Sequence, residues 1–151
     1  MATVAHDVHA KVDPKKAYEA ISTEAGFRNW WTRGSKVDPK VGGEAEFRFG
    51  LMGGAAMTFR IEKIEPGKSV KLRCIRTDPP GGHVGGWVGT ELEFRVEPGA
   101  GGGTVVHISH GGWPDGMPKE ALDGTQQGWA HFGASLEQYL ETGTGAPDTG
   151  G

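Results

Sequence analysis

Hydrophobic and polar residues alternate with a period of two along most of the chain between residues 44 and 110. The pattern recurs in EAEFRFG (44–50), MTFRIEKI (57–64), SVKLRCIR (69–76), TELEFRVE (90–97) and TVVHISH (104–110). Such alternation predicts about five antiparallel strands, each with one face in the core and the other in water. The Gly- and Pro-containing segments between them predict hairpin loops.

The segments on either side of this region predict helices and one more strand. Residues 3–11 predict a first strand, and Asp13-Pro14 then supplies an N-cap residue and a proline at the first helical position. Two short helices follow, and residues 119–141 predict one long helix with a hydrophobic stripe. A sheet with one hydrophobic face needs a covering layer. We therefore expect an α+β fold in which a curved antiparallel sheet wraps around a long C-terminal helix.

The second short helix carries Phe27, Trp30 and Trp31, whose spacing of three and four residues places them on one face. Adjacent residues on a helix differ by about 100° in direction. We therefore expect the two tryptophan rings to point in different directions. One would be buried in the core and the other, Trp31, would border the mouth of a cavity.

Composition limits the classes of function. The net charge is −3, with 16 basic residues spread among 19 acidic ones, which argues against nucleic-acid binding. No hydrophobic run approaches the ~18 residues of a membrane span, and the first residues lack the pattern of a signal peptide. Cys74 is the only cysteine, so we expect no intramolecular disulfide and a reducing, cytoplasmic location. Glycine is abundant, and the last glycine-rich group predicts a flexible tail, residues 146–151, after a single domain, residues 1–145.

Several segments together resemble a known family. They are DPKKAYEAISTEAGFRNWW, VGGEAEFRFG, GWVGTELEFRV, GGTVVHISHGGW and GWAHFGASLEQYLETGTG. In order and spacing they resemble the SRPBCC (START-like) superfamily, and most of all its branch of heat-shock-protein-90 ATPase activator homologues. The resemblance implies a helix-grip fold, as in START and Bet v-like proteins, with a hydrophobic cavity between sheet and long helix. Known functions in the superfamily include ligand carriers, polyketide cyclases and stress-related or chaperone-linked proteins, so the fold alone does not select one.

Inward-facing aromatic residues are the candidate walls of this cavity, although the same side chains could simply fill a core. Two Gly/Pro-rich loops, residues 77–89 and 110–120, are candidate lids, with the alternative that their tryptophans cover the ends of the core. Gly128 and Gly133 within the long helix indicate either a ligand or tight packing, because glycine there costs about 1 kcal/mol relative to Ala. The predicted cavity residues are Trp31, Phe47, Phe49, Phe59, Arg76, Trp87, Phe94, His110, Trp113, Trp129 and Phe132.

Arg76 and His110 are the polar members of this set. Each lies two residues beyond the last inward-facing hydrophobic residue of its strand, so alternation predicts that it also faces inward. Buried polar groups need hydrogen-bond partners. Together they could orient a carboxylate or a phenol; the alternatives are that Arg76 reaches solvent and that His110 is hydrogen-bonded structure. No metal or cofactor is predicted, because His107 and His110 differ in parity and point to opposite faces of a strand.

The sequence favours a cytoplasmic binding protein for a hydrophobic small molecule, either aromatic or acyl. Two alternatives stay open. One is a cyclase- or hydrolase-like enzyme with His110 as acid or base, assisted by Arg76 or Tyr139. The other is a protein-interaction or chaperone-linked stress module, or a homodimer, for which an exposed hydrophobic patch would be expected.

Overall fold

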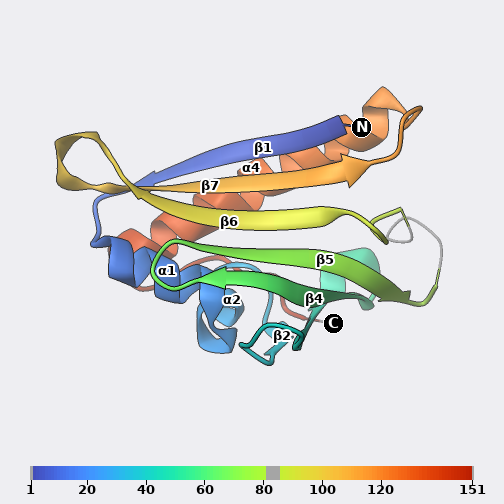
Figure 1. Ribbon diagram of the computed structural model, residues 1–151, viewed down its shortest axis with the longest axis horizontal. Helices are drawn as coiled ribbons and strands as arrows, with labels where there is room; N and C mark the ends of the chain where they lie inside the picture. The colour runs from blue at the N-terminus through green and yellow to red at the C-terminus, as the bar shows by residue number, and fades with distance from the viewer. Residues whose placement is uncertain (1, 81–85, 151) are drawn as a thin grey trace.

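The computed structural model describes residues 2–80 and 86–150. Within them the chain forms a seven-stranded sheet in the order β1-β7-β6-β5-β4-β3-β2, and all neighbouring strands are antiparallel (Figure 1). The strands are β1 (Ala2–Ala10), β2 (Gly34–Val37), β3 (Glu44–Phe49), β4 (Ala55–Glu65), β5 (Ser69–Asp78), β6 (Glu91–Pro98) and β7 (Thr104–Trp113). Strands β2 to β7 follow one another as a meander, and β1 is added beside β7.

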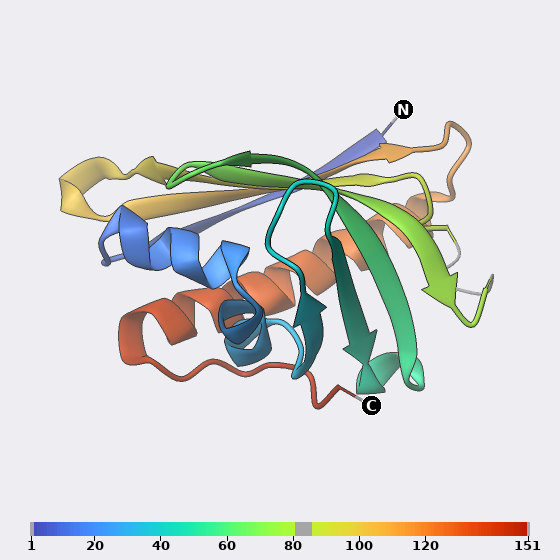
Figure 2. The ribbon, with the colours of Figure 1, turned by 60° about the horizontal axis from the view of Figure 1, so that its bottom comes forward.

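All three α-helices in the described residues lie on the same face of the sheet (Figure 2). They are α1 (Pro14–Ser22), α2 (Glu24–Trp30) and α4 (Lys119–Thr142). The side chain of Asp13 caps α1 by accepting the N–H of Lys15, and Thr23 caps α2 in the same way. Helix α4 ends at Gly143, whose φ of 85° suits glycine. The predicted helix-grip architecture is confirmed.

The core between α2 and the sheet is aromatic. Phe27 and Trp30 lie 5.7 and 6.0 Å from Phe94, between ring centroids. The rings of Trp30 and Trp31 are stacked, 5.8 Å apart with 12° between their planes, and both are buried. The two side chains nevertheless have different surroundings: the indole N–H of Trp30 donates to the backbone oxygen of Ala20, whereas Trp31 packs against Phe47 and Trp129.

The sheet differs from its prediction in two places. Strand β2 was not expected, because four residues carry too short an alternation to be distinguished from a loop. Strand β5 contains an irregularity: Cys74 pairs with Phe59 of β4, but Arg76 pairs with the adjacent Thr58, so Ile75 is an extra residue. An extra residue of this kind reverses the side-chain parity beyond it. The predicted inward direction of Arg76 is therefore wrong.

The C-terminal residues are packed against the protein. The carboxylate of Asp148 accepts the backbone N–H groups of Gly50 and Leu51 at 2.5 and 3.0 Å. The N–H of Ala146 donates to Ser135 Oγ on α4 at 2.8 Å. The sequence predicts a flexible tail here, and in the structure specific hydrogen bonds connect residues 146–150 to α4 and to the end of β3.

Candidate functional site

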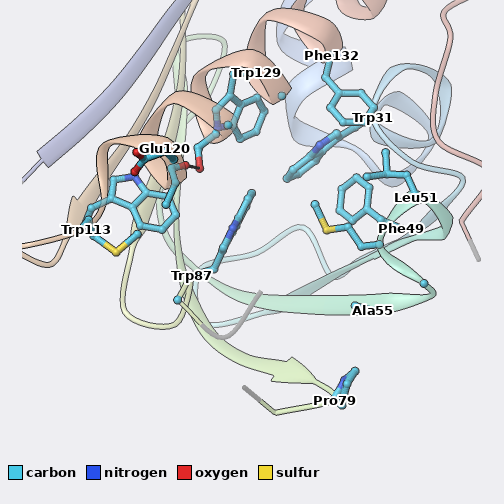
Figure 3. A pocket seen from close by; sticks show the side chains of 18 residues that line it. Trp31, Phe49, Leu51, Ala55, Pro79, Trp87, Trp113, Glu120, Trp129 and Phe132 are labelled. Carbon is cyan, nitrogen blue, oxygen red and sulfur yellow. Dashed lines mark hydrogen bonds between the residues drawn. The ribbon is translucent and has the colours of Figure 1, made fainter. Parts of the chain in front are cut away.

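A pocket of about 670 Å³ lies between the N-terminal half of α4 and one end of the sheet (Figure 3). Its lining comes from the end of α2, from β3, the turn after it and the start of β4, from the segments after β5 and before β6, from the end of β7, and from α4. The lining residues are Trp31, Phe49, Leu51, Met52, Gly53, Ala55, Pro79, Gly86, Trp87, Trp113, Met117, Glu120, Ala121, Gly124, Thr125, Gly128, Trp129 and Phe132. Of these described residues only Glu120 is charged, so the pocket is mainly hydrophobic.

Aromatic rings form most of the wall, and they contact one another around the pocket. The ring centroids of Trp31 and Trp129 are 5.2 Å apart, and those of Trp87 and Trp113 are 6.0 Å apart at nearly a right angle. Phe49 of β3 and Phe132 of α4 complete the aromatic wall, with centroids 5.9 Å apart. Such edge and tilted contacts are the preferred arrangements of aromatic pairs. The wall is therefore built from rings that support each other in fixed positions.

Glycines in α4 keep part of the pocket open. A Cβ atom added at Gly124 or Gly128 would meet no heavy atom of the described residues within 4 Å. At Gly133, five residues after Gly128, an added Cβ would come within 2.5 Å of the ring of His6 and 3.2 Å of Val8 Cγ2 on β1. Tight packing therefore accounts for Gly133. Gly128 instead leaves space that a side chain would fill.

His110 lies behind the pocket wall and holds three of its tryptophans. The Nε1–H of Trp129 donates to Nδ1 of His110 at 3.1 Å, and Nε2 of His110 lies 2.9 Å from the hydroxyl of Thr90. That hydroxyl donates to the backbone oxygen of Trp87 at 2.6 Å. Trp113 Nε1–H donates to the backbone oxygen of His110 at 3.0 Å. Because Nδ1 accepts, the proton of the neutral ring is on Nε2. Every donor in this hydrogen-bond network then has an acceptor.

The same environment determines the charge of His110. Burial disfavours the imidazolium form and lowers the pKa of His110 from 6.5 to about 3. The ring is fully buried and is not one of the pocket-lining residues. In this geometry both of its nitrogens are already hydrogen-bonded. His110 therefore positions the surrounding indoles, and the structure does not support its hypothetical role as an acid or base.

The other predicted cavity residues fall into three groups. Six of them line the pocket together: Trp31, Phe49, Trp87, Trp113, Trp129 and Phe132. Phe47, Phe59 and Phe94 do point inward, but they are buried deeper in the core and do not line the pocket. Arg76 lies on the opposite, solvent-exposed side of the sheet, where it forms an ion pair with Glu44. The extra residue in β5 is the physical reason for that error.

Sequence reasoning missed several lining residues. The missed residues include Leu51 and Met52 of the short 3-10 turn after β3, whereas Met117, just before α4, and Glu120 in its first turn lie within the predicted 110–120 lid. The missed positions follow no strand or helix periodicity that points to a cavity, so alternation could not identify them. Residues 81–85 of the predicted 77–89 lid lie outside the described residues.

Across residues 2–80 and 86–150, no group of three or more His, Cys, Asp or Glu side chains is arranged to hold a metal ion. No helix in this described part of the chain is both long and apolar enough to cross a bilayer.

Comparison with known proteins identifies relatives in sequence and in structure. Residues 11–141 match the family model described as "Activator of Hsp90 ATPase homolog 1-like protein". The solution structure of the Aha1 dimer from Colwellia psychrerythraea is 30% identical to the chain, with a TM-score of 0.77 over 96% of this chain and 100% of that one. The search of curated proteins found no match.

More distant structures share the fold. DynU16, from the dynemicin biosynthetic locus, is 19% identical with a TM-score of 0.75, over 95% of this chain and 48% of its own. The Mesorhizobium loti protein MLL2253 is also 19% identical, with a TM-score of 0.76 over 92% of this chain and 96% of its own. At this level of identity the similarity establishes the architecture alone.

Proposed function

The chain belongs to the Activator of Hsp90 ATPase homolog 1-like family, and we propose that it binds a hydrophobic small molecule in the pocket beneath α4. The observation that carries the proposal is the pocket of about 670 Å³, walled by aromatic rings and left open at Gly124 and Gly128. Ligand sites are typically concave, mostly apolar and 300–1,000 Å³ in volume. This pocket has those properties.

The glycines support a binding role because glycine within a helix lowers the stability of that helix. Replacing Ala by Gly in a helix interior costs about 1 kcal/mol. At Gly128 no close neighbour among the described residues demands the absence of a Cβ. Retaining glycine there keeps the volume free, which benefits a ligand and does not benefit the stability of the protein alone.

A direct test is a panel of aromatic and acyl compounds followed by intrinsic fluorescence and thermal unfolding. Four of the five tryptophans line the pocket, so a bound ligand is expected to change the emission strongly: Trp31, Trp87, Trp113 and Trp129. Binding to the native state alone also raises the unfolding temperature. A panel that changes neither signal would contradict the proposal.

A pocket-filling variant separates binding from folding. In Gly128→Leu the new side chain occupies the open volume, and Leu is a better helix former than Gly. We expect ligand affinity to fall at least tenfold while the unfolding temperature stays equal or rises. Ala130→Leu is the matched control, because Ala130 lies on the exposed face of the same helix and is not a lining residue. Equal loss of binding in both variants would count against this site.

Self-association is a second proposal, and the dimeric state of the 30% identical Colwellia protein favours it. Leu51 at the pocket rim is a large exposed hydrophobic residue, as is Val88 beside Trp87. Such residues are suited to a contact between copies. Sedimentation over a range of concentrations is the test, and a monomer throughout would contradict it. The chaperone link and the cytoplasmic location stay predictions.

A further inference from the structure

The five tryptophans differ in what their indole N–H groups do. Three of these groups donate hydrogen bonds inside the protein: those of Trp30, Trp113 and Trp129. Trp31 and Trp87 have no hydrogen-bond partner for their indole nitrogen within the described residues. Buried N–H groups in proteins are nearly always paired. Both of these tryptophans line the pocket.

Trp31 is the enclosed member of the two. Its side chain is 2% exposed, whereas the ring of Trp87 is partly exposed. No fully enclosed side-chain nitrogen or oxygen in the described part of the chain lacks a partner. The Trp31 nitrogen must therefore touch open space, and the pocket is the space that this residue lines. Figure 3 shows Trp31 and Trp87 extending from opposite sides toward the middle of the pocket.

The charges around the pocket restrict the ligand further. No Lys, Arg or His is among the described lining residues, and Glu120 at the start of α4 is negative. Thr125 offers no free hydroxyl proton, because its hydroxyl donates to the backbone oxygen of Ala121 at 3.0 Å. A carboxylate entering this pocket would lose its hydration without gaining a cation from the described lining residues. Among the described residues, the pocket therefore offers a hydrogen-bond donor but no cationic side chain for a negative charge.

We propose that the pocket selects uncharged aromatic ligands that carry a hydrogen-bond acceptor, such as a ketone carbonyl, and that Trp31 Nε1–H donates to this acceptor. The inference rests on the proposed function and names its ligand class. It narrows the sequence prediction of an aromatic or acyl ligand, because it disfavours free carboxylates. The flat walls made by Trp31, Trp129 and Phe132 suit a planar aromatic body.

Three naphthalenes of similar size test this proposal by titration calorimetry. 2-Acetylnaphthalene has a neutral acceptor, 2-ethylnaphthalene has none, and 2-naphthoate has a charged one. We expect the ketone to bind several-fold to about tenfold more tightly than the hydrocarbon, as a net hydrogen bond allows. We expect the carboxylate to bind most weakly. Equal affinities of ketone and hydrocarbon, or tightest binding of the carboxylate, would overturn the inference.

Two tryptophan variants assign the donor. Trp31→Phe removes the free N–H, so the ketone and the hydrocarbon should bind about equally. Trp113→Phe is the matched control, because Trp113 also lines the pocket but its N–H is donated to His110. This control should keep the ketone preference. Loss of the preference in Trp113→Phe but not in Trp31→Phe would overturn the assignment.

A spectroscopic measurement avoids reliance on a variant that fails to fold. In ¹⁵N-labelled wild-type protein, the ketone should shift the indole N–H proton of Trp31 downfield, and 2-ethylnaphthalene should not. An unchanged Trp31 signal on ketone saturation would overturn the inference. Binding of the hydrocarbon without a ketone preference leaves the proposed function intact and overturns only the inference. Failure of all three compounds to bind would overturn both.

Discussion

The two halves of α4 face the same sheet but are packed very differently. In the C-terminal half, Phe132, Leu136 and Leu140 are buried and the helix approaches β1 closely at Gly133. In the N-terminal half, Leu122 is only partly buried and Gly128 faces open space. One continuous helix therefore covers the core with its C-terminal half and lines a pocket with its N-terminal half. The stability of the protein should depend on the C-terminal half of α4, and its binding capacity should depend on the N-terminal half.

The comparison also shows that one sequence signal can have opposite causes. Gly128 and Gly133 both lower the helix propensity of α4 by about 1 kcal/mol. At Gly133 the helix gains close contact with His6 and Val8 of β1. At Gly128 the missing Cβ instead leaves empty volume in the pocket. Spacing along the helix cannot distinguish these causes, because both depend on what lies opposite the missing Cβ.

The largest expected contrast is between leucines in the two halves. Leu136→Ala should lower the free energy of unfolding by about 2–5 kcal/mol, because it creates a cavity in a fully buried region. Leu122→Ala should cost less than about 1.5 kcal/mol, because Leu122 is partly exposed. Urea unfolding of both variants measures the difference. Equal losses would mean that the N-terminal half is as tightly packed as the other.

A second prediction concerns His110, which supports the pocket half. Its pKa is lowered to about 3 in the folded protein and is near 6.5 when unfolded. The unfolded state therefore binds the extra proton first. The stability contributed by the neutral ring is complete above pH 6.5 and is lost as the pH falls toward 3. Between pH 7.5 and 4.5 this should remove about 2–3 kcal/mol.

His110→Gln isolates this contribution. The Gln side chain has an oxygen that can accept the N–H of Trp129 and an amide that can donate to Thr90, but it does not titrate. Urea unfolding of both proteins at the two pH values gives the difference, in which the other titrating groups cancel. We expect the wild type to lose about 2–3 kcal/mol more than the variant on acidification. Parallel pH profiles would show that His110 is not held neutral.

The architecture was predictable from the sequence because alternation and helical stripes are local. The errors of the sequence prediction were local too. The extra residue Ile75 in β5 shifts the register by one position and turns Arg76 outward. A single extra residue leaves no recognisable change in the hydrophobicity pattern. The inward direction of Phe59 and Phe94 followed from parity, but their exclusion from the pocket did not. Depth within a core depends on how neighbouring rings pack, which is a property of the assembled fold.

The two glycines give a third prediction of intermediate size. Gly128→Ala should stabilise the protein by up to about 1 kcal/mol, because helix propensity improves and the methyl group enters open space. Gly133→Ala gains the same propensity but forces His6 to move, and overpacking of this kind costs about 1–3 kcal/mol. We therefore expect Gly133→Ala to be less stable than Gly128→Ala by about 1–3 kcal/mol in urea unfolding. The reverse order would refute the contrast between the halves.

The smallest expected effect concerns Asp148, which ties the C-terminal segment to the pocket rim. Its carboxylate accepts the N–H groups of Gly50 and Leu51, and its backbone N–H donates to the oxygen of Trp31 at 2.9 Å. Asp148→Asn exchanges one acceptor oxygen for an NH₂ group that cannot accept. We expect a loss of only about 0.5–1.5 kcal/mol in stability, with faster hydrogen exchange at the amides of Gly50 and Leu51.

Asp123→Asn is the matched control for this variant, because Asp123 forms only an exposed pair with Lys119 on α4. Such pairs contribute at most about 1 kcal/mol, and no change at the amides of Gly50 and Leu51 is expected. The buried amides around Leu136 should be equally protected in both variants, since neither change reaches the closed half of α4. Exchange that accelerates throughout the helix in Asp148→Asn would mean that the rim and the core open together, and the two halves of α4 would then be a single cooperative unit.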